Sequence, residues 1–398
     1  MTLSFEPTRT AALSRLADFV PHTGRDYASL RNFDLPGHPH VSGLSPYIKH
    51  RLITEEEVLQ ATLGRFSLSS AEKFVQEVYW RTYWKGWLEM RPSVWTMYQS
   101  SVQAQINRIQ TESGLRQEWE AACKGETGIE CFDHWANELT STGYLHNHAR
   151  MWFASIWIFT LRLPWELGAD FFIRHLLDGD PASNTLGWRW VAGLQTAGKT
   201  YLARTSNIAK FTKERFRPQY QLAGDAPAVQ GFPNPDRAPL PLADSLDTSV
   251  PTVLILTDDD LSPGFLLDRG LSPVATAVVS THKGRSPLEV ADHIPAFFDT
   301  ATKDVTDRYG ARLGTVEPVS ADDLQSWAAD HGADHIVTAY TPVGWTNDAL
   351  SRASGDIPLR RIRRSYDESA WPYATAGFFK FKEKIPRLVA DLKGLRAA

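Results

Sequence analysis

Apolar side chains recur at helical spacing through the first half of the chain. Between residues 27 and 216 they follow the period of an amphipathic helix, and no alternating strand pattern interrupts them. Thr54 and Glu57 form a capping box that opens a short helix, and Ser69 or Ser70 is expected to cap a longer one. The pattern predicts helices at 71–90, 132–141, 146–161 and 169–177, with a polar turn region at 179–187.

The pattern changes twice in the second half. Residues 218–249 carry six prolines and form a semi-extended linker, while residues 1–26 form a weakly specified extension. From residue 250 onward, short apolar runs alternate with helical patterns. The predicted strands are 252–257, 274–280 and 335–339, and the helices 288–298 and 321–331. This alternation predicts a Rossmann-like parallel α/β domain over 250–398, after an all-helical domain over 27–217.

Composition limits the classes of function. The 42 Lys and Arg residues against 46 Asp and Glu residues give a net charge of -4, which argues against a general nucleic-acid coat protein. No apolar run reaches the roughly 18 residues that a membrane helix needs, and residues 1–13 lack a signal-peptide pattern. We therefore expect a cytoplasmic protein, and we expect it to be a monomer. Two cysteines are too few for an iron–sulfur cluster, which takes about four.

Tryptophan is the unusual residue, because most of the 14 lie between Trp80 and Trp190. A bulky helical core and a site for stacking or electron transfer both explain this clustering. Arg150 is more informative, because a guanidinium on an apolar helix needs a carboxylate partner, and Asp178 and Asp180 are the candidates. Glu77 and Arg81 lie four residues apart and can pair on one helix face.

Metal chemistry receives no support from the histidines. His146 and His148 lie two residues apart and diverge on a helix, so we predict no metal site. Three acidic residues, 258–260, follow the first predicted strand and could ligate Mg²⁺ or cap the next helix. Capping is the expectation we favour.

Four segments together resemble the flavin-binding domain of the photolyase/cryptochrome family. They occur in one order: Ser42–Tyr47, Glu77–Arg81, Thr142–Arg150 and Asp178–Trp190. The α/β domain resembles the antenna domain of that family more loosely, and its last part, from Ala370 to Phe381, resembles the region before the interdomain linker. The family places the α/β domain first, so the order here is inverted.

The resemblance implies a bent FAD inside the helical domain. It places Arg150 and Asp178 against the isoalloxazine ring, Asp180 at the ring edge, and Asn184 at flavin N5, where photolyases typically carry Asn. The implied cofactor-binding set is completed by Tyr27, Ser42, Gly43, Leu44, Ser45, Arg81, Asn147 and Gly179. A folate or deazaflavin antenna pigment is a further possibility, although no pocket for it is evident in the sequence.

The resemblance also implies light-driven repair of pyrimidine dimers in UV-damaged DNA. Glu77 matches the residue that hydrogen-bonds the lesion, and Trp80 and Trp190 match positions that contact it. Trp188 and Trp165 match the inner members of an electron relay whose outer member is missing from residues 96–117; Trp84, Trp157 or a tyrosine could replace it.

Lys199 and Arg204 begin a basic segment that is either a solvated face or a phosphate-contacting rim. A cryptochrome-like photoreceptor and a flavoprotein without photochemistry are the alternative functions.

Overall fold

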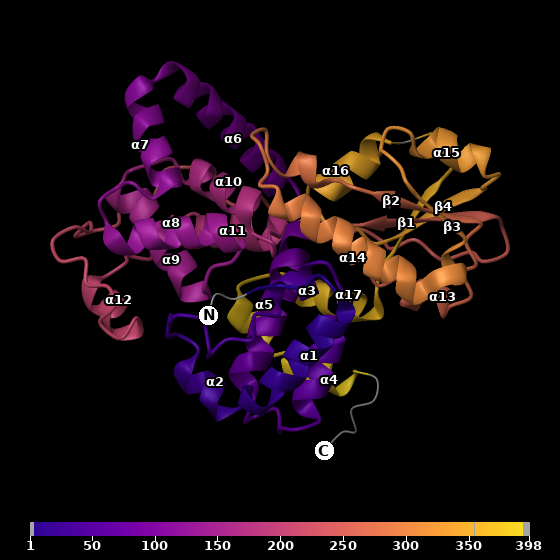
Figure 1. Cartoon of the computed structure of the whole chain (residues 1–398), viewed down its shortest axis with the longest axis horizontal. Coiled ribbons are helices and arrows are strands. Elements are labelled where there is room, and N and C mark those ends of the chain that lie inside the picture. The colour runs from indigo at the N-terminus through magenta and orange to yellow at the C-terminus, as the bar shows by residue number, and fades with distance from the viewer. Residues whose placement is uncertain (1–3, 354, 393–398) are drawn as a thin grey trace.

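The computed structural model describes residues 4–353 and 355–392. Its first half is helical, as predicted, and its second half contains a parallel sheet (Figure 1). The helical elements of the first half are α1 (Arg9–Phe19), η1 (Val20–His22), α2 (Arg25–Leu30), α3 (Ser45–Lys49), α4 (Glu55–Leu63), α5 (Glu72–Glu89), α6 (Ser93–Thr111), α7 (Ser113–Lys124), α8 (Glu130–Thr142), α9 (Asn147–Ser155), η2 (Ile156–Thr160), α10 (Trp165–His175), α11 (Pro181–Val191) and α12 (Thr205–Phe211).

Local signals predicted some helix ends and missed others. The capping box of Thr54 and Glu57 is present at the start of α4. No side chain caps α5, so the prediction of a serine cap was wrong. The hydroxyl of Ser67 instead contacts those of Ser69 and Ser70, each at 3.0 Å, and this turn uses the serines before the helix begins.

Three segments that were predicted to be irregular or were left unassigned contain helices. The turn region at 179–187 is mostly the helix α11, because Asp180 caps it and Pro181 takes its first position. α1 lies within the predicted N-terminal extension and buries Ala12, Leu16 and Phe19. Helices α6 and α7 fill the unassigned stretch between α5 and α8.

The second half is built on a five-stranded sheet in which every pair is parallel, with strand order β3-β2-β1-β4-β5. The Rossmann-like fold class is therefore confirmed. The strands are β1 (Thr252–Thr257), β2 (Ala275–Val279), β3 (Thr315–Pro318), β4 (His335–Ala339) and β5 (Leu359–Ile362). The other elements are α13 (Gly264–Leu267), η3 (His282–Arg285), α14 (His293–Tyr309), η4 (Gly310–Leu313), α15 (Leu324–Asp330), α16 (Trp345–Arg352), α17 (Ser365–Ala370), η5 (Trp371–Tyr373), α18 (Phe378–Lys382) and α19 (Ile385–Ala390).

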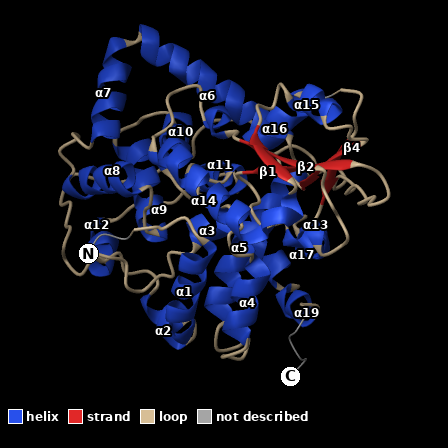
Figure 2. Ribbon diagram, turned by 45° about the vertical axis from the view of Figure 1, so that its right-hand side comes forward, coloured by secondary structure: helices blue, strands red, loops and turns tan. Residues whose placement is uncertain are grey.

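Alternate residues of β1 serve two cores. Val253 and Ile255 belong to a small core with Leu324 of α15. Leu254 and Leu256 belong to a larger core that also contains Phe298 of α14 and continues into the helical half. Helices therefore cover both faces of the sheet (Figure 2). One core of buried side chains joins the two halves.

The last helices return to α5. The hydroxyls of Thr82 and Tyr366 lie 2.9 Å apart, and Tyr83 donates to the carbonyl of Ala376 at 2.7 Å. A Cβ added to Gly86 would lie 2.9 Å from the backbone of Trp371. The segment after β5 is thus packed against the helical half through this close approach.

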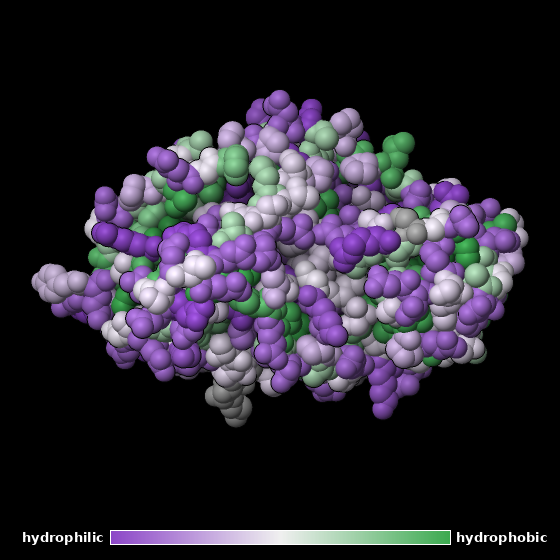
Figure 3. Space-filling model, turned by 90° about the horizontal axis from the view of Figure 1, so that it is seen from above, coloured by the Kyte–Doolittle hydropathy of each residue, from purple (hydrophilic) through white to green (hydrophobic). Residues whose placement is uncertain are grey.

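The linker crosses the surface without helix or strand, but it is anchored. The amide of Ala238 donates to Met90 O at 2.8 Å, and the carboxylate of Asp244 accepts from the Arg361 amide at 2.8 Å. The face seen in Figure 3 is largely hydrophilic, with small separate apolar areas. Within the described ranges, no helix is long and apolar enough to cross a membrane.

The carboxyl end of β1 is a buried charged junction. Lys49 Nζ lies 2.6 Å from Asp259, and Arg364 makes two 2.8 Å hydrogen bonds to Asp260. Asp258 accepts from the Thr281 hydroxyl at 2.6 Å. The acidic triplet therefore binds cations of both halves, and the capping prediction was wrong: Pro263 precedes α13 without a side-chain cap.

Candidate functional site

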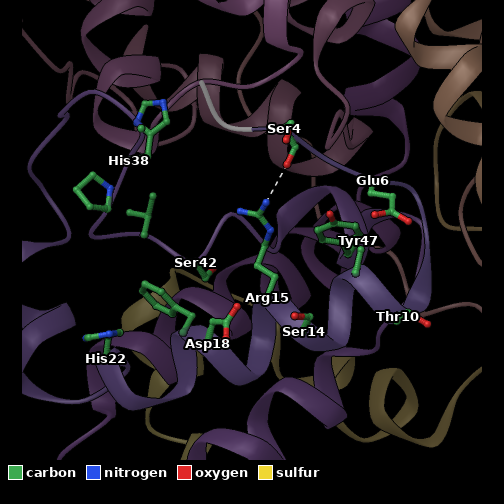
Figure 4. Close-up of a pocket in the computed structure, with 15 residues that line it drawn as sticks. Ser4, Glu6, Thr10, Ser14, Arg15, Asp18, His22, His38, Ser42 and Tyr47 are labelled. Carbon is green, nitrogen blue, oxygen red and sulfur yellow. Dashed lines mark hydrogen bonds between the residues drawn. The ribbon is translucent and has the colours of Figure 1, made fainter. Parts of the chain in front are cut away.

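A polar cavity of about 730 Å³ lies between α1 and the loop before α3 (Figure 4). Ser42 lines one wall, and Ser14 and Arg15 of α1 line another. Gly43 has φ +61°, a left-handed conformation that favours glycine, and Leu44 N–H donates to Ser42 Oγ at 3.3 Å. The predicted phosphate loop, residues 42–45, thus borders an open polar space.

Arg150 and Asp178 form the pair that the sequence required. Arg150 Nη2 lies 2.8 Å from Asp178 Oδ2, and its Nε donates to Leu145 O at 2.9 Å. Asp178 Oδ1 is buried and accepts no hydrogen bond within the described part of the chain. An unpaired buried acceptor beside a guanidinium is suited to a polar ligand group.

Asp180 lies at the start of α11 and faces two cations of α5. Its Oδ1 accepts from the Ser183 amide at 2.9 Å, and its Oδ2 lies 3.4 Å from Arg81 and 3.5 Å from Lys85 Nζ. Burial opposes ionisation of Asp180, but Lys85 and Arg81 outweigh it and hold its pKa well below the ordinary value. Lys85 was not predicted, although it lies one helical turn after Arg81.

Asn184 and Gly179 complete this turn. The Asn184 side-chain nitrogen donates to Ala169 O at 2.9 Å, which fixes the orientation of the amide. A Cβ on Gly179 would lie 3.0 Å from Leu176 O and 3.1 Å from Arg285 Nη1, so the close packing favours glycine there. The structure therefore places Asp178, Gly179, Asp180 and Asn184 around one helix start.

Glu77 and Trp80 have partners that the sequence did not suggest. Glu77 pairs with Arg31 of α2, and Arg81 is directed to Asp180, so the expected Glu77–Arg81 pair does not form. The Trp80 ring stacks on Phe378 of α18, with centroids 3.6 Å apart and an interplanar angle of 12°. Tyr27 lies in T-shaped contact with Phe74 at 5.1 Å and with Phe19 at 6.1 Å; Phe19 lines the cavity at Ser42, whereas Tyr27 is not among its lining residues.

The other three tryptophans predicted as site residues lie in separate aromatic contacts. Trp188 is buried, 5.0 Å from Phe172 and 6.2 Å from Trp157 between ring centroids. Trp165 lies 5.7 Å from Tyr98, and Trp190 stacks on Tyr201 at 5.6 Å. The aromatic neighbours of the two predicted relay residues thus include Trp157, beside Trp188, and Tyr98, beside Trp165.

Three predicted contact residues are exposed. Asn147 begins α9. Lys199 and Arg204 lie in the loop between α11 and α12, and Arg204 directly precedes α12. None of them is among the residues of the Asp178–Asn184 turn or the cavity at Ser42. Their roles toward a cofactor or nucleic acid stay predictions.

A further cluster was missed by the sequence. His38 Nε2 lies 2.8 Å from Glu138 Oε1, and its Nδ1 lies 3.4 Å from Asp34 Oδ1. Burial opposes protonation of His38, but hydrogen bonds to Asp34 and Glu138 outweigh it and raise its pKa to about 9. The charged imidazole ties the segment before Ser42 to α8. A long sequence separation between His38 and Glu138 hid this contact.

Residues 74–221 match the family described as the FAD binding domain of DNA photolyase. Among similar curated proteins, the deoxyribodipyrimidine photo-lyase of a Synechococcus species is 34% identical over 194 residues, which is 47% of this chain and 39% of the relative. The protein of that name from Escherichia coli is 30% identical over 210 residues, 50% of this chain and 42% of the relative.

Two solved structures are also similar. A class III photolyase from Agrobacterium tumefaciens has a TM-score of 0.43 at 26% identity, covering 52% of this chain and 43% of that one. A Synechocystis cryptochrome has a TM-score of 0.44 at 22% identity, covering 53% and 44%. The chain spans about two fifths of the length of the curated relatives named here. Residues 74–221, within the helical half, thus form a domain of the photolyase FAD-binding family.

The chain accordingly contains an FAD-binding domain. The donors and acceptors present fit this cofactor: Asp178 Oδ1 is an unpaired buried acceptor beside Arg150, and a polar cavity opens at the predicted phosphate loop. Arg150, Asp178, Asp180 and Asn184 would hold the ring, and residues 42–45 the diphosphate. These assignments stay predictions.

Proposed function

We propose that this chain is a light-driven flavoenzyme that splits UV-induced pyrimidine dimers in DNA. The observation that carries the proposal is the match of residues 74–221 to the FAD binding domain of DNA photolyase, because this stretch contains Arg81, the Arg150–Asp178 pair and Asn184. The relatives named deoxyribodipyrimidine photo-lyase support the same activity.

Bound FAD, in reduced form, would supply the light-absorbing electron donor for this reaction. The chain's own groups orient it: the Arg150–Asp178 pair supplies a fixed charge pair, and Asn184 presents an amide oriented by Ala169 O. Arg81 and Lys85 keep Asp180 ionised, so its carboxylate serves as an acceptor for N–H groups. Arg81, Lys85, Arg150 and Asn184 lie on helices, which favours a preorganised site.

Glu77 is the proposed contact to the lesion. Its carboxylate is partly exposed, with 31% of the side-chain surface accessible, and Arg31 is its partner in the free chain. A base pair that reaches Glu77 would share or replace that partner. Lys199 and Arg204, both exposed, would contact DNA phosphates with marked dependence on salt.

A repair assay with UV-irradiated oligothymidine tests the proposal. Reduced, illuminated protein should restore the ultraviolet absorbance of thymine, and Glu77→Gln should lower the quantum yield several-fold while FAD stays bound. Glu72→Gln is the matched control, since Glu72 lies on the same helix and pairs with Lys382 at 2.8 Å. Equal yields for wild type and Glu77→Gln would contradict the role of Glu77, and no repair by wild type would contradict the function.

One observation favours a second candidate, a photoreceptor of the cryptochrome type without repair. One face of the Trp80 ring is stacked on Phe378, with the ring centroids 3.6 Å apart. A base could stack there only after α18 moves. Photoreduction of the flavin without any change in the irradiated oligonucleotide would support this candidate.

A further inference from the structure

The cavity at Ser42 contains a cation that the predicted cofactor site does not include. Arg15 of α1 lies across this space from the phosphate loop, in a helix that the sequence indicated only as an extension (Figure 4). Arg15 Nη2 donates to Ser4 O at 2.8 Å, and its guanidinium carbon lies 6.0 Å from the Tyr47 ring centroid. Within residues 4–353 and 355–392, no carboxylate forms a salt bridge with Arg15.

Ser42 lines the cavity and begins a loop with free backbone donors. The amides of Ser42 and Gly43 have no hydrogen-bond acceptor among the described residues. Gly43 is left-handed, with φ +61°, and Leu44 follows in a right-handed conformation, with φ -84° and ψ -12°. This alternation forms an anion-binding nest from the N–H groups of residues 43, 44 and 45, of which the Leu44 N–H already donates to Ser42 Oγ.

The other side chains of the cavity are polar and of both charge signs. Ser14 and His22 add possible donors, whereas Asp18 and Glu6 are acidic. The volume of about 730 Å³ is large enough for a diphosphate with an attached nucleoside. A guanidinium binds phosphate oxygens in a two-pronged fashion, and a nest binds them through N–H groups.

We propose that Arg15 binds the diphosphate of the dinucleotide cofactor, opposite the amides of Ser42 and Gly43, and that Asp18 weakens this binding through repulsion. The inference rests on the proposed flavin function and deepens it, because it assigns α1 to the cofactor site. In this arrangement α1 supplies a positive charge, which the phosphate loop (residues 42–45) lacks.

FAD titration of the apoprotein, followed by quenching of flavin fluorescence, tests the assignment. Arg15→Gln should raise the Kd for FAD by about 10- to 100-fold, the loss of one charge-assisted contact. The same variant should leave the Kd for riboflavin, which has no diphosphate, unchanged. Asp18→Asn should tighten FAD binding a few-fold at low salt.

Arg25→Gln is the matched control, since Arg25 is an exposed arginine on the neighbouring α2 and does not line this cavity. ADP should compete with FAD for the wild type and compete more weakly in Arg15→Gln. Circular dichroism checks that each variant is folded. Equal FAD affinity in wild type and folded Arg15→Gln would overturn the inference, whereas a wild type that binds no FAD would overturn the proposed function itself.

Discussion

At the scale of single residues, the site depends on small side chains as much as on charged ones. Gly168 of α10 receives the indole of Trp188: a Cβ there would lie 2.3 Å from Trp188 Cη2 and 3.0 Å from Trp157 Cδ2. Both rings are buried and have little room to move. Glycine therefore allows α11 to place Trp188 beside the helix that carries Trp165.

Gly168→Ala should destabilise the protein by about 1–3 kcal/mol, because the added methyl overpacks the core. Gly187→Ala, on α11, is the control: nothing lies within 4 Å of its Cβ, and alanine favours a helix. Urea unfolding followed by circular dichroism measures both. A Gly168→Ala variant as stable as Gly187→Ala would show that Trp188 does not pack as described.

At the scale of elements, α5 and α11 meet through charge. Asp180 caps α11 with one carboxylate oxygen and faces Arg81 and Lys85 of α5 with the other. Both Asp180 and Lys85 are buried, so each needs its partner. The pair thus fixes the helix that carries Asn184 against the helix that carries Glu77.

Asp180→Asn removes the negative charge but keeps the helix cap, because Asn is as good a cap as Asp. It should cost about 3–5 kcal/mol, since Lys85 loses its buried counter-ion and Arg81 keeps only Glu55, 3.6 Å away. Adding Lys85→Met should recover part of that loss, which a double-mutant cycle in urea would show. A loss below about 1 kcal/mol for Asp180→Asn would mean that the cap, not the charge, is what matters.

At the scale of the whole molecule, the two halves are joined at the carboxyl end of β1. His50 bridges them: its Nδ1 lies 2.7 Å from Asp258 O, and its Nε2 lies 3.3 Å from Leu177 O. Burial and the neighbouring Lys49 lower the pKa of His50 to about 3. This junction occupies the crevice where open parallel sheets bind ligands.

The pKa of His50 predicts acid sensitivity. In the unfolded chain the His50 imidazole takes up a proton near pH 6.5, whereas in the folded protein it stays neutral down to about pH 3. The free energy of unfolding is therefore unaffected by His50 above pH 6.5 and falls as the pH is lowered from 6.5 toward about 3. His50→Gln should reduce the slope of unfolding free energy between pH 6 and pH 5 by about 1.4 kcal/mol per pH unit. Urea unfolding at both pH values measures it, with exposed His134→Gln as control. If His50→Gln left the pH dependence of the unfolding free energy unchanged, His50 would have to be charged in the folded protein.

Helical periodicity and compact apolar runs allowed both fold types to be predicted, because they are properties of neighbouring residues. β1 and β4 have the predicted bounds, 252–257 and 335–339. The Arg150 partner was also predictable, since a cation on an apolar helix must be paired. The turn at 179–187 was mispredicted because a helix start, Asp-Pro, was read only as a loop signal.

Sequence alone thus predicted the two classes of structure, the resemblance to a family of flavin-binding domains and the set of cofactor residues to examine, because each depends on short-range pattern or motif. Tertiary structure decided which groups meet: Lys49 with Asp259, His38 with Glu138, Trp80 with Phe378, and Arg15 across from Ser42. These pairs are remote in the chain or hidden in undistinguished segments. Only the packing of helices against each other and against the sheet brings the first three pairs into contact and places Arg15 and Ser42 at one cavity.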